Sequence, residues 1–129
     1  MVHLLRLEQG TSDQGCGLFL ELSKVSEQPK ISVIISTYNA EAWLEKVLWG
    51  FNCQTYRNFE VVIADDGSGP ATRQLLERMR SEVFYPIEHV WQEDDGFQKS
   101  RILNKSVAAC KSEYIIMTDG DCILREDFV

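Results

Sequence analysis

Four short apolar runs, separated by segments with helical periodicity, constrain the fold of this chain more than any other feature. The runs cover residues 31–36, 59–64, 87–91 and 114–117. Their β-branched residues and near-continuous apolarity are typical of strands whose two faces are both covered. The intervening segments are long enough for right-handed crossovers through a helix. The sequence therefore predicts an α/β fold of three layers, α/β/α, with a mainly parallel sheet.

Three helices are expected between these strands. The first should begin with Asn39 as its N-cap, because apolar residues recur at helical spacing after it. The residues of this helix that we expect in the core include Trp43, Leu44, Val47, Leu48, Trp49 and Phe51. The second helix should begin at Pro70, since proline is favoured in a first turn, and the third should run from Lys99 to Cys110.

The composition limits the class of protein. With 129 residues and 44% apolar content, the chain can bury one core, so one domain is expected. A net charge of -7 disfavours a nucleic-acid partner, because phosphate backbones are bound by clustered Lys and Arg. No apolar stretch approaches the roughly 20 residues of a membrane span, and the first residues lack the long apolar region of a secretory signal. We expect a cytoplasmic protein, free or at the cytoplasmic face of the membrane.

Polar clusters follow each predicted strand at its carboxyl end, which is the edge at which parallel sheets bind ligands. These clusters cover residues 37–39, 65–68, 93–95 and 119–121. Asp119 and Asp121 are separated by one glycine and suit a divalent cation near a phosphate group. Because a bare diphosphate would be repelled by these carboxylates, the predicted cofactor is Mn²⁺ or Mg²⁺.

Three of these clusters together resemble the nucleotide-binding half of the family 2 glycosyltransferases, which are inverting enzymes with the A-type fold. The matching motifs are Thr37-Tyr38-Asn39, Asp65-Asp66-Gly67-Ser68 and Asp119-Gly120-Asp121. Residues 95–105 are more similar to the bacterial polysaccharide and chondroitin-polymerase-like branch of that family. The resemblance implies a nucleotide-sugar-binding part over residues 31–129, preceded by a leader of unclear structure over residues 1–30.

The resemblance also implies a role for each matched residue. Tyr38, between Thr37 and Asn39, would stack on the nucleobase. Asp66, or failing that Asp65, would accept a hydrogen bond from the base, most often uracil. Asp119 would contact the ribose or sugar, and Asp119 and Asp121 would be the metal site, with Asp121 as its ligand. The donor would be a UDP-sugar and the acceptor a saccharide or a lipid-linked molecule.

The cation that binds the diphosphate is expected at a different position from that in most of the family. The commonest pattern opens this segment with an Arg-Asn pair, whereas this chain has Leu103-Asn104. Lys99 and Arg101 lie near the acidic loop and are the two candidates.

The catalytic base is not identified by the sequence. In the resembled family the acceptor site and the base lie in a second half, after the paired aspartates, and the substitutes in this chain would be Glu93, Asp94 and Asp95. We therefore expect the chain to bind donor and to perform little or no transfer by itself. The alternative is a non-catalytic sugar-nucleotide-binding module or truncated pseudoenzyme. A nucleotidyltransferase or other α/β phosphate-binding enzyme is disfavoured, because nucleotidyltransferases usually carry a glycine-rich basic loop after the first strand, where this chain has Thr37-Tyr38-Asn39.

The last predicted strand also raises the question of an exposed sheet edge. In the resembled fold, residues 114–117 lie inside a sheet that continues beyond them. An unpaired apolar edge invites association, so homodimers or aggregates are expected.

Within residues 1–30, a loop is expected over 8–17 and a short helix or strand over 18–22, and the leader could pack on the sheet.

Overall fold

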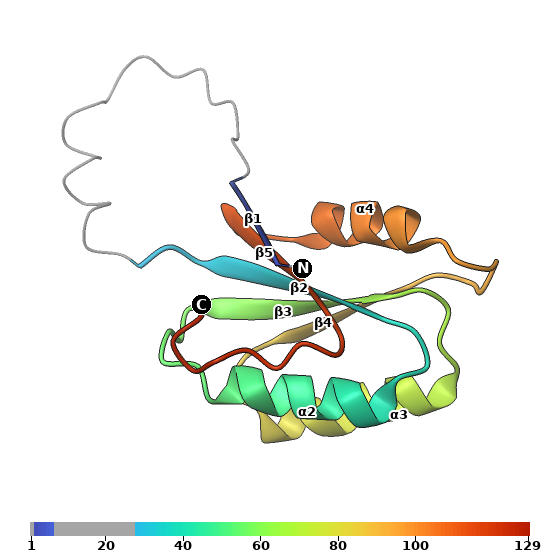
Figure 1. The fold of residues 1–129 in the computed structure, drawn as a ribbon, viewed down its shortest axis with the longest axis horizontal. Coiled ribbons are helices and arrows are strands. Elements are labelled where there is room, and N and C mark those ends of the chain that lie inside the picture. Colours follow the sequence, from blue (N-terminus) through green and yellow to red (C-terminus); the bar gives the residue numbers. More distant parts are fainter. Residues whose placement is uncertain (1, 7–27) are drawn as a thin grey trace, which may run out of the picture.

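A twisted sheet forms the middle layer of the molecule (Figure 1). The computed structural model describes residues 2–6 and 28–129, and within them the sheet has five strands in the order β1-β5-β2-β3-β4. The strands are β1 His3–Arg6, β2 Ile31–Thr37, β3 Phe59–Asp65, β4 Ile87–Trp91 and β5 Tyr114–Asp119. β2 pairs in parallel with both β3 and β5, β3 pairs in parallel with β4, and β1 is antiparallel to β5. The four predicted strands and the mainly parallel sheet are confirmed.

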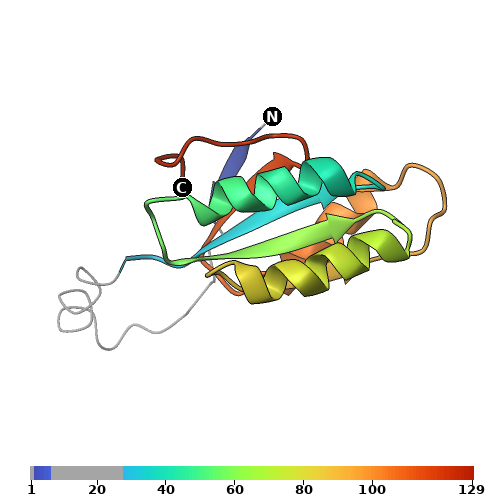
Figure 2. The same ribbon diagram turned by 90° about the horizontal axis from the view of Figure 1, so that it is seen from below.

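Helices cover both faces of the sheet, as Figures 1 and 2 show. α2 Glu41–Asn52 and α3 Pro70–Glu82 lie on one face, and α4 Lys99–Ala109 lies on the other. The second and third helices begin at the predicted Pro70 and Lys99. No helix in the described ranges combines the length and the apolarity that a membrane crossing would require.

The first helix begins later than predicted. Ala40, not Asn39, is the N-cap of α2, and no side chain caps it. Asn39 has a positive φ of 44°, and its Oδ1 accepts a hydrogen bond of 2.9 Å from the backbone N of Gly69, the N-cap of α3. The backbone N of Asn39 donates to Ser68 Oγ at 2.9 Å. Asn39 therefore joins the loops that precede two helices, a long-range role that local spacing does not reveal.

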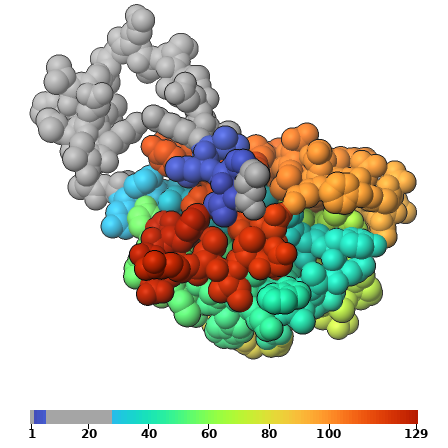
Figure 3. All heavy atoms as spheres, in the orientation of Figure 1, coloured from blue at the N-terminus to red at the C-terminus, as the bar shows by residue number. Residues whose placement is uncertain are grey.

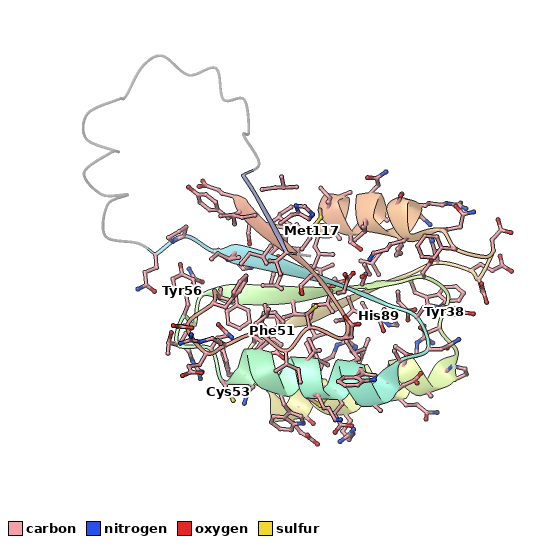
Figure 4. The ribbon with its side chains drawn as sticks, viewed as in Figure 1. Tyr38, Phe51, Cys53, Tyr56, His89 and Met117 are labelled. Carbon is pink, nitrogen blue, oxygen red and sulfur yellow. The ribbon has the colours of Figure 1, made fainter. Side chains whose placement is uncertain are left out.

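Two apolar clusters fill the space between the layers. The larger lies between the sheet and α2 with α3, and Phe51 belongs to it; the smaller lies between the sheet and α4, and Met117 packs against it (Figure 4). The prediction that Trp43 and Trp49 belong to the core is wrong, because their exposed fractions are 53% and 39%. Both stand beside the buried stripe of α2, where helical spacing alone does not separate its border from its centre.

β1 changes the predicted sheet edge. Residues His3 to Arg6 pair with Met117 to Tyr114, so the outer edge of β5 is occupied. The prediction of an unpaired apolar edge at β5 is therefore wrong, and with it the reason for expecting homodimers. β1 is short and pairs with a strand more than a hundred residues away, a contact without a local signal. The loop predicted over 8–17 and the element predicted over 18–22 lie outside the described residues.

The segment after β5 returns along the α2 side of the sheet, next to β1 (Figure 3). Gln54, which is 1% exposed, holds this segment at its far end. Its Nε2 donates to the carbonyl of Arg125 at 2.5 Å, and its Oε1 accepts from the backbone N of Phe128 and of Val129 at 3.2 and 3.1 Å. One buried amide therefore anchors the chain that follows Asp119 and Asp121.

Replacing Gln54 with methionine keeps the volume of the side chain and removes these hydrogen bonds. We expect Gln54→Met to lower the free energy of unfolding by about 2 kcal/mol, measured by urea denaturation, because buried backbone groups lose their partners. Gln74→Met, at an exposed position of α3, is the matched control and should change it by less than about 0.5 kcal/mol. Equal effects of the two changes would contradict the anchoring role.

Candidate functional site

A cavity of about 710 Å³ opens at the carboxyl ends of the parallel strands. Its wall includes the predicted site residues Thr37, Tyr38, Asp66, Lys99, Asp119 and Asp121. Because β2 pairs with β3 and with β5, the loops that follow these strands meet at one edge. The expected convergence of these side chains is therefore present. Figure 4 shows Tyr38 at this end of the molecule and Tyr56 at the opposite end.

Three of the predicted site residues lie away from the cavity wall. Asn39 joins the two helix entries, as described above, and Arg101 is exposed on α4. Asp65 is fully buried, and its Oδ2 accepts a hydrogen bond of 2.8 Å from His89 Nε2. Its Oδ1 accepts from the backbone N of Ser68, also at 2.8 Å. Of the two adjacent aspartates, only Asp66 lines the cavity.

Asp65 shapes the turn that carries Asp66. Burial raises the pKa of the Asp65 carboxyl, but the hydrogen bonds from His89 and Ser68 outweigh it, so the pKa lies below its ordinary value. A carboxylate that stays ionised in this position ties the end of β3 to β4 and to the turn over residues 65–68.

Asp66 is held by the loop that follows β4. Its Oδ1 accepts a hydrogen bond of 2.6 Å from Gln92 Nε2, and its Oδ2 accepts one of 2.8 Å from the backbone N of Gln98. Gln92 is not among the site residues predicted from the sequence. A glutamine directly after a predicted strand and beside an acidic loop was the available signal, but its partner is 26 residues away.

The same loop also contacts Tyr38. The Tyr38 hydroxyl donates to Asp94 Oδ2 at 2.9 Å, and Asp94 raises the pKa of the tyrosine. The ring is 51% exposed on the cavity wall. Gly67 has a φ of 97°, and a Cβ on it would lie 2.6 Å from Asp94 Cα. The glycine thus lets the loop over residues 92–98 pack directly on the turn over residues 65–68.

Asp119 forms an ion pair with the side chain of Lys99. Its Oδ1 accepts hydrogen bonds from Lys99 Nζ and, at 2.8 Å, from Ser36 Oγ. Lys99, followed by Ser36, holds the pKa of the Asp119 carboxyl below its ordinary value. At Gly120 a Cβ would lie 2.7 Å from the Ser36 carbonyl, so only glycine allows the backbone to approach β2 this closely.

The donor set fits a divalent cation that takes most of its ligands from elsewhere. Asp121 lines the cavity and is exposed, while Asp119 is shared with Lys99. Mg²⁺ and Mn²⁺ prefer oxygen ligands, and Mg²⁺ commonly uses one or two carboxylates together with phosphate oxygens and water. Among the described residues, no three His, Cys, Asp or Glu side chains converge as a metal cage.

The cavity wall also contains residues that are not among the predicted site residues. Trp43, expected in the core, lines the cavity from the first turn of α2, and Phe97 lines it with an exposed fraction of 87%. Thr37 is only 7% exposed, and its Oγ1 has no hydrogen-bond partner within the described part of the chain. The cavity therefore combines aromatic surface, carboxylates, one lysine and a buried hydroxyl.

Gly67 offers a test of the packing between the two loops. Gly67→Ala combines a positive φ with a clash against the Asp94 backbone, so we expect it to lower the free energy of unfolding by about 3 kcal/mol. Gly96→Ala is the matched control, because Gly96 has a φ of 72° but open space around its Cα; we expect a loss of about 1 kcal/mol. If urea denaturation shows that both substitutions lower the free energy of unfolding equally, the interpretation that Gly67 is required for close packing of the loops is wrong.

Asp65 offers a test against pH. Because the folded pKa lies below the unfolded value near 4, its stabilisation is present above about pH 4 and is lost as the pH falls. We expect Asp65→Asn to lower the free energy of unfolding by about 2 kcal/mol at about pH 7 and by much less at about pH 3. Asp127→Asn, at an exposed site, is the control. A loss that is the same at both pH values would refute this assignment.

Comparisons with known proteins agree with this geometry. The model of the glycosyl transferase family 2 matches residues 32–129. Glycosyltransferase GlyA of Streptococcus pneumoniae serotype 4 is 33% identical over 78% of this chain and 14% of its own length. The structure of Staphylococcus aureus TarS in complex with UDP-GlcNAc is 28% identical with a TM-score of 0.61, over 75% of this chain and 28% of that one.

A second solved structure has a similar fold. Mannosyltransferase PcManGT from Pyrobaculum calidifontis, in complex with GDP-Man and Mn²⁺, is 26% identical with a TM-score of 0.65, over 74% of this chain and 28% of that one. The chain thus spans 14% of the length of GlyA and 28% of each of the two chains of known structure, which are TarS 1–349 and PcManGT. With a family model matched over most of its residues, the chain belongs to glycosyl transferase family 2 and has the A-type fold of those enzymes.

Proposed function

We propose that this chain, through residues 31–129, supplies the donor-binding part of a glycosyltransferase that uses a UDP-sugar together with Mn²⁺ or Mg²⁺. The observation that carries the proposal is the convergence of Tyr38, Asp66, Lys99 and Asp121 on one cavity. TarS in complex with UDP-GlcNAc and PcManGT in complex with GDP-Man and Mn²⁺ support it as structural neighbours.

The nucleoside would bind at the end of the cavity formed by Tyr38 and Asp66. The exposed ring of Tyr38 offers a flat face for stacking, and its bond to Asp94 fixes the ring in place. The Asp66 carboxylate accepts hydrogen bonds only, so it favours a base that presents an N–H group, as uracil does at N3. The buried Oγ1 of Thr37, on the same wall, supplies a further polar contact.

The diphosphate would bind at the opposite part of the wall, near Asp119 and Asp121. Asp121 would hold the metal, with Asp119 beside it, and the bound metal would offset the negative charge of the departing diphosphate. Lys99 lies on the wall and Arg101 does not, so Lys99 is the favoured candidate for the protein cation at the diphosphate. Asp119 keeps Lys99 oriented toward this region.

The proposed reaction is inverting transfer to an acceptor hydroxyl of a saccharide or lipid-linked molecule. The hydroxyl oxygen would bond to the anomeric carbon, the bond from that carbon to the diphosphate oxygen would break, and a general base would take the hydroxyl proton. Asp94 lines the cavity but contacts Tyr38, at the nucleobase end, while Glu93 and Asp95 are off the wall. We therefore assign the base to no residue that the structure describes.

Calorimetric titration tests the proposal. The 129-residue chain should bind UDP more tightly than CDP, and Mn²⁺ should raise the affinity for UDP at least about tenfold, because the metal links phosphate to carboxylate. In Asp121→Asn the effect of Mn²⁺ should fall to about twofold or less, since the anionic ligand is lost. GDP measured alongside reports whether a purine is accepted.

Asp127→Asn is the matched control, because Asp127 is exposed in the same segment and pairs with Arg125. It should retain the full effect of Mn²⁺. The donor-binding proposal is wrong if Mn²⁺ has no effect on UDP affinity in the unaltered chain. Incubation with UDP-sugar and Mn²⁺ then separates an enzyme, which consumes the donor, from a binding module, which only retains it.

A further inference from the structure

We propose that Gln92 is a positioning residue that sets the preference of the site for uracil over cytosine by orienting the Asp66 carboxylate. The inference rests on the proposed function, in which Asp66 accepts a hydrogen bond from the nucleobase. Gln92 follows β4 directly, is 5% exposed, and is not part of the cavity wall. It would therefore act through Asp66 rather than on the ligand.

The amide of Gln92 makes full use of its donors. Its Nε2 donates to Asp66 Oδ1 at 2.6 Å and to the carbonyl of Gln98 at 3.2 Å. Its backbone N donates to the Asp65 carbonyl at 3.2 Å, which fixes the start of the loop against the end of β3. The backbone N of Gln98 donates to the other oxygen, Asp66 Oδ2. The loop over residues 92–98 therefore holds both oxygens of the Asp66 carboxylate.

The orientation of this amide is set by the chemistry of its neighbours. Turning it over would place Oε1 against Asp66 Oδ1 and the Gln98 carbonyl, which are both acceptors. In the observed orientation Gln92 Oε1 is buried and has no hydrogen-bond partner among the described residues. A buried oxygen without a hydrogen-bond partner is unfavourable, so this orientation leaves one polar atom of Gln92 unpaired. What it gains is the hydrogen bond that Nε2 donates to Asp66.

A fixed carboxylate can discriminate between bases. Each carboxylate oxygen has two lone pairs, and the bonds from Gln92 and Gln98 leave acceptor capacity that can face the cavity. Uracil presents a donor at N3, whereas cytosine presents an acceptor there, so a carboxylate held toward N3 binds the first and repels the second. Without Gln92, the carboxylate keeps one donor and can turn about its Cβ–Cγ bond, and the discrimination falls.

A neighbouring residue of the same loop should give a different signature. Asp94 holds the Tyr38 ring, and stacking on a ring is nearly indifferent to which pyrimidine is bound. Asp94→Ala should therefore weaken UDP and CDP by a similar factor. A general disturbance of the loop would do the same, so only a change in the ratio of the two affinities reports positioning of Asp66.

The test measures UDP and CDP binding in the presence of Mn²⁺ by calorimetry. Gln92→Met keeps the volume and removes the donor; we expect UDP affinity to fall about tenfold and CDP affinity to change by less than about twofold. Gln74→Met, at an exposed position on α3, should leave both affinities unchanged. A Gln92→Met protein that keeps the full preference for UDP overturns the inference, and so does an equal loss for both nucleotides.

An NMR measurement on the unaltered chain covers the case in which Gln92→Met does not fold. The side-chain amide signals of Gln92 should shift on addition of UDP with Mg²⁺, which is diamagnetic and does not broaden them, and should stay unchanged with Mg²⁺ and pyrophosphate, which lacks the base. Equal shifts with both ligands overturn the positioning role. If the unaltered chain binds neither UDP nor CDP, the proposed function is wrong. If both the unaltered chain and Gln92→Met prefer UDP, only this inference is wrong.

Discussion

Parallel pairing of β2 with β3 on one side and β5 on the other is the constraint on which the rest of the molecule depends. The register sets Thr37 opposite Asp65 and Ser36 opposite Asp119, so the three strands end at the same level. Strands that run in one direction must return through helices, which then cover both faces and bury the apolar runs. The segments that follow the carboxyl ends of all three strands therefore meet at one edge, where they line the cavity.

The loops at this edge are joined to one another by side chains that reach across the strand order. Asn39 holds the entry of α3, Tyr38 holds Asp94, and Asp66 receives bonds from Gln92 and Gln98. Loops normally vary in conformation because they lack a regular hydrogen-bond pattern. Here the cross-loop bonds replace that pattern, so the cavity has a defined wall before any ligand binds. Such preorganisation reduces the entropy lost on binding.

The charges of the cavity are arranged in two parts. Asp66 and Asp94 are held by neutral donors at the Tyr38 end, where the proposed ligand group is an uncharged base. Asp119 is instead paired with the cationic side chain of Lys99, and Asp121 follows two residues later, where the proposed ligand group is the charged diphosphate. These two kinds of partner match a nucleoside diphosphate, which carries both an uncharged base and a charged diphosphate. The acidic composition is therefore compatible with an anionic ligand, provided that a cation mediates the contact.

Local sequence patterns determined the four main strands, the starts of α3 and α4, and the edge at which Asp66, Lys99 and Asp121 meet, because apolar periodicity and parallel topology are enough to place strand ends. Tertiary structure alone decided which of the adjacent Asp65 and Asp66 faces the cavity, since His89 of β4 draws Asp65 into the core. It also decided the pairing of β1, the contact between Gln92 and Asp66, and the place of Trp43 on the wall. The first two features depend on a partner that is distant in the sequence, and the place of Trp43 depends on where the buried face of α2 ends. The periodicity of apolar residues reports neither.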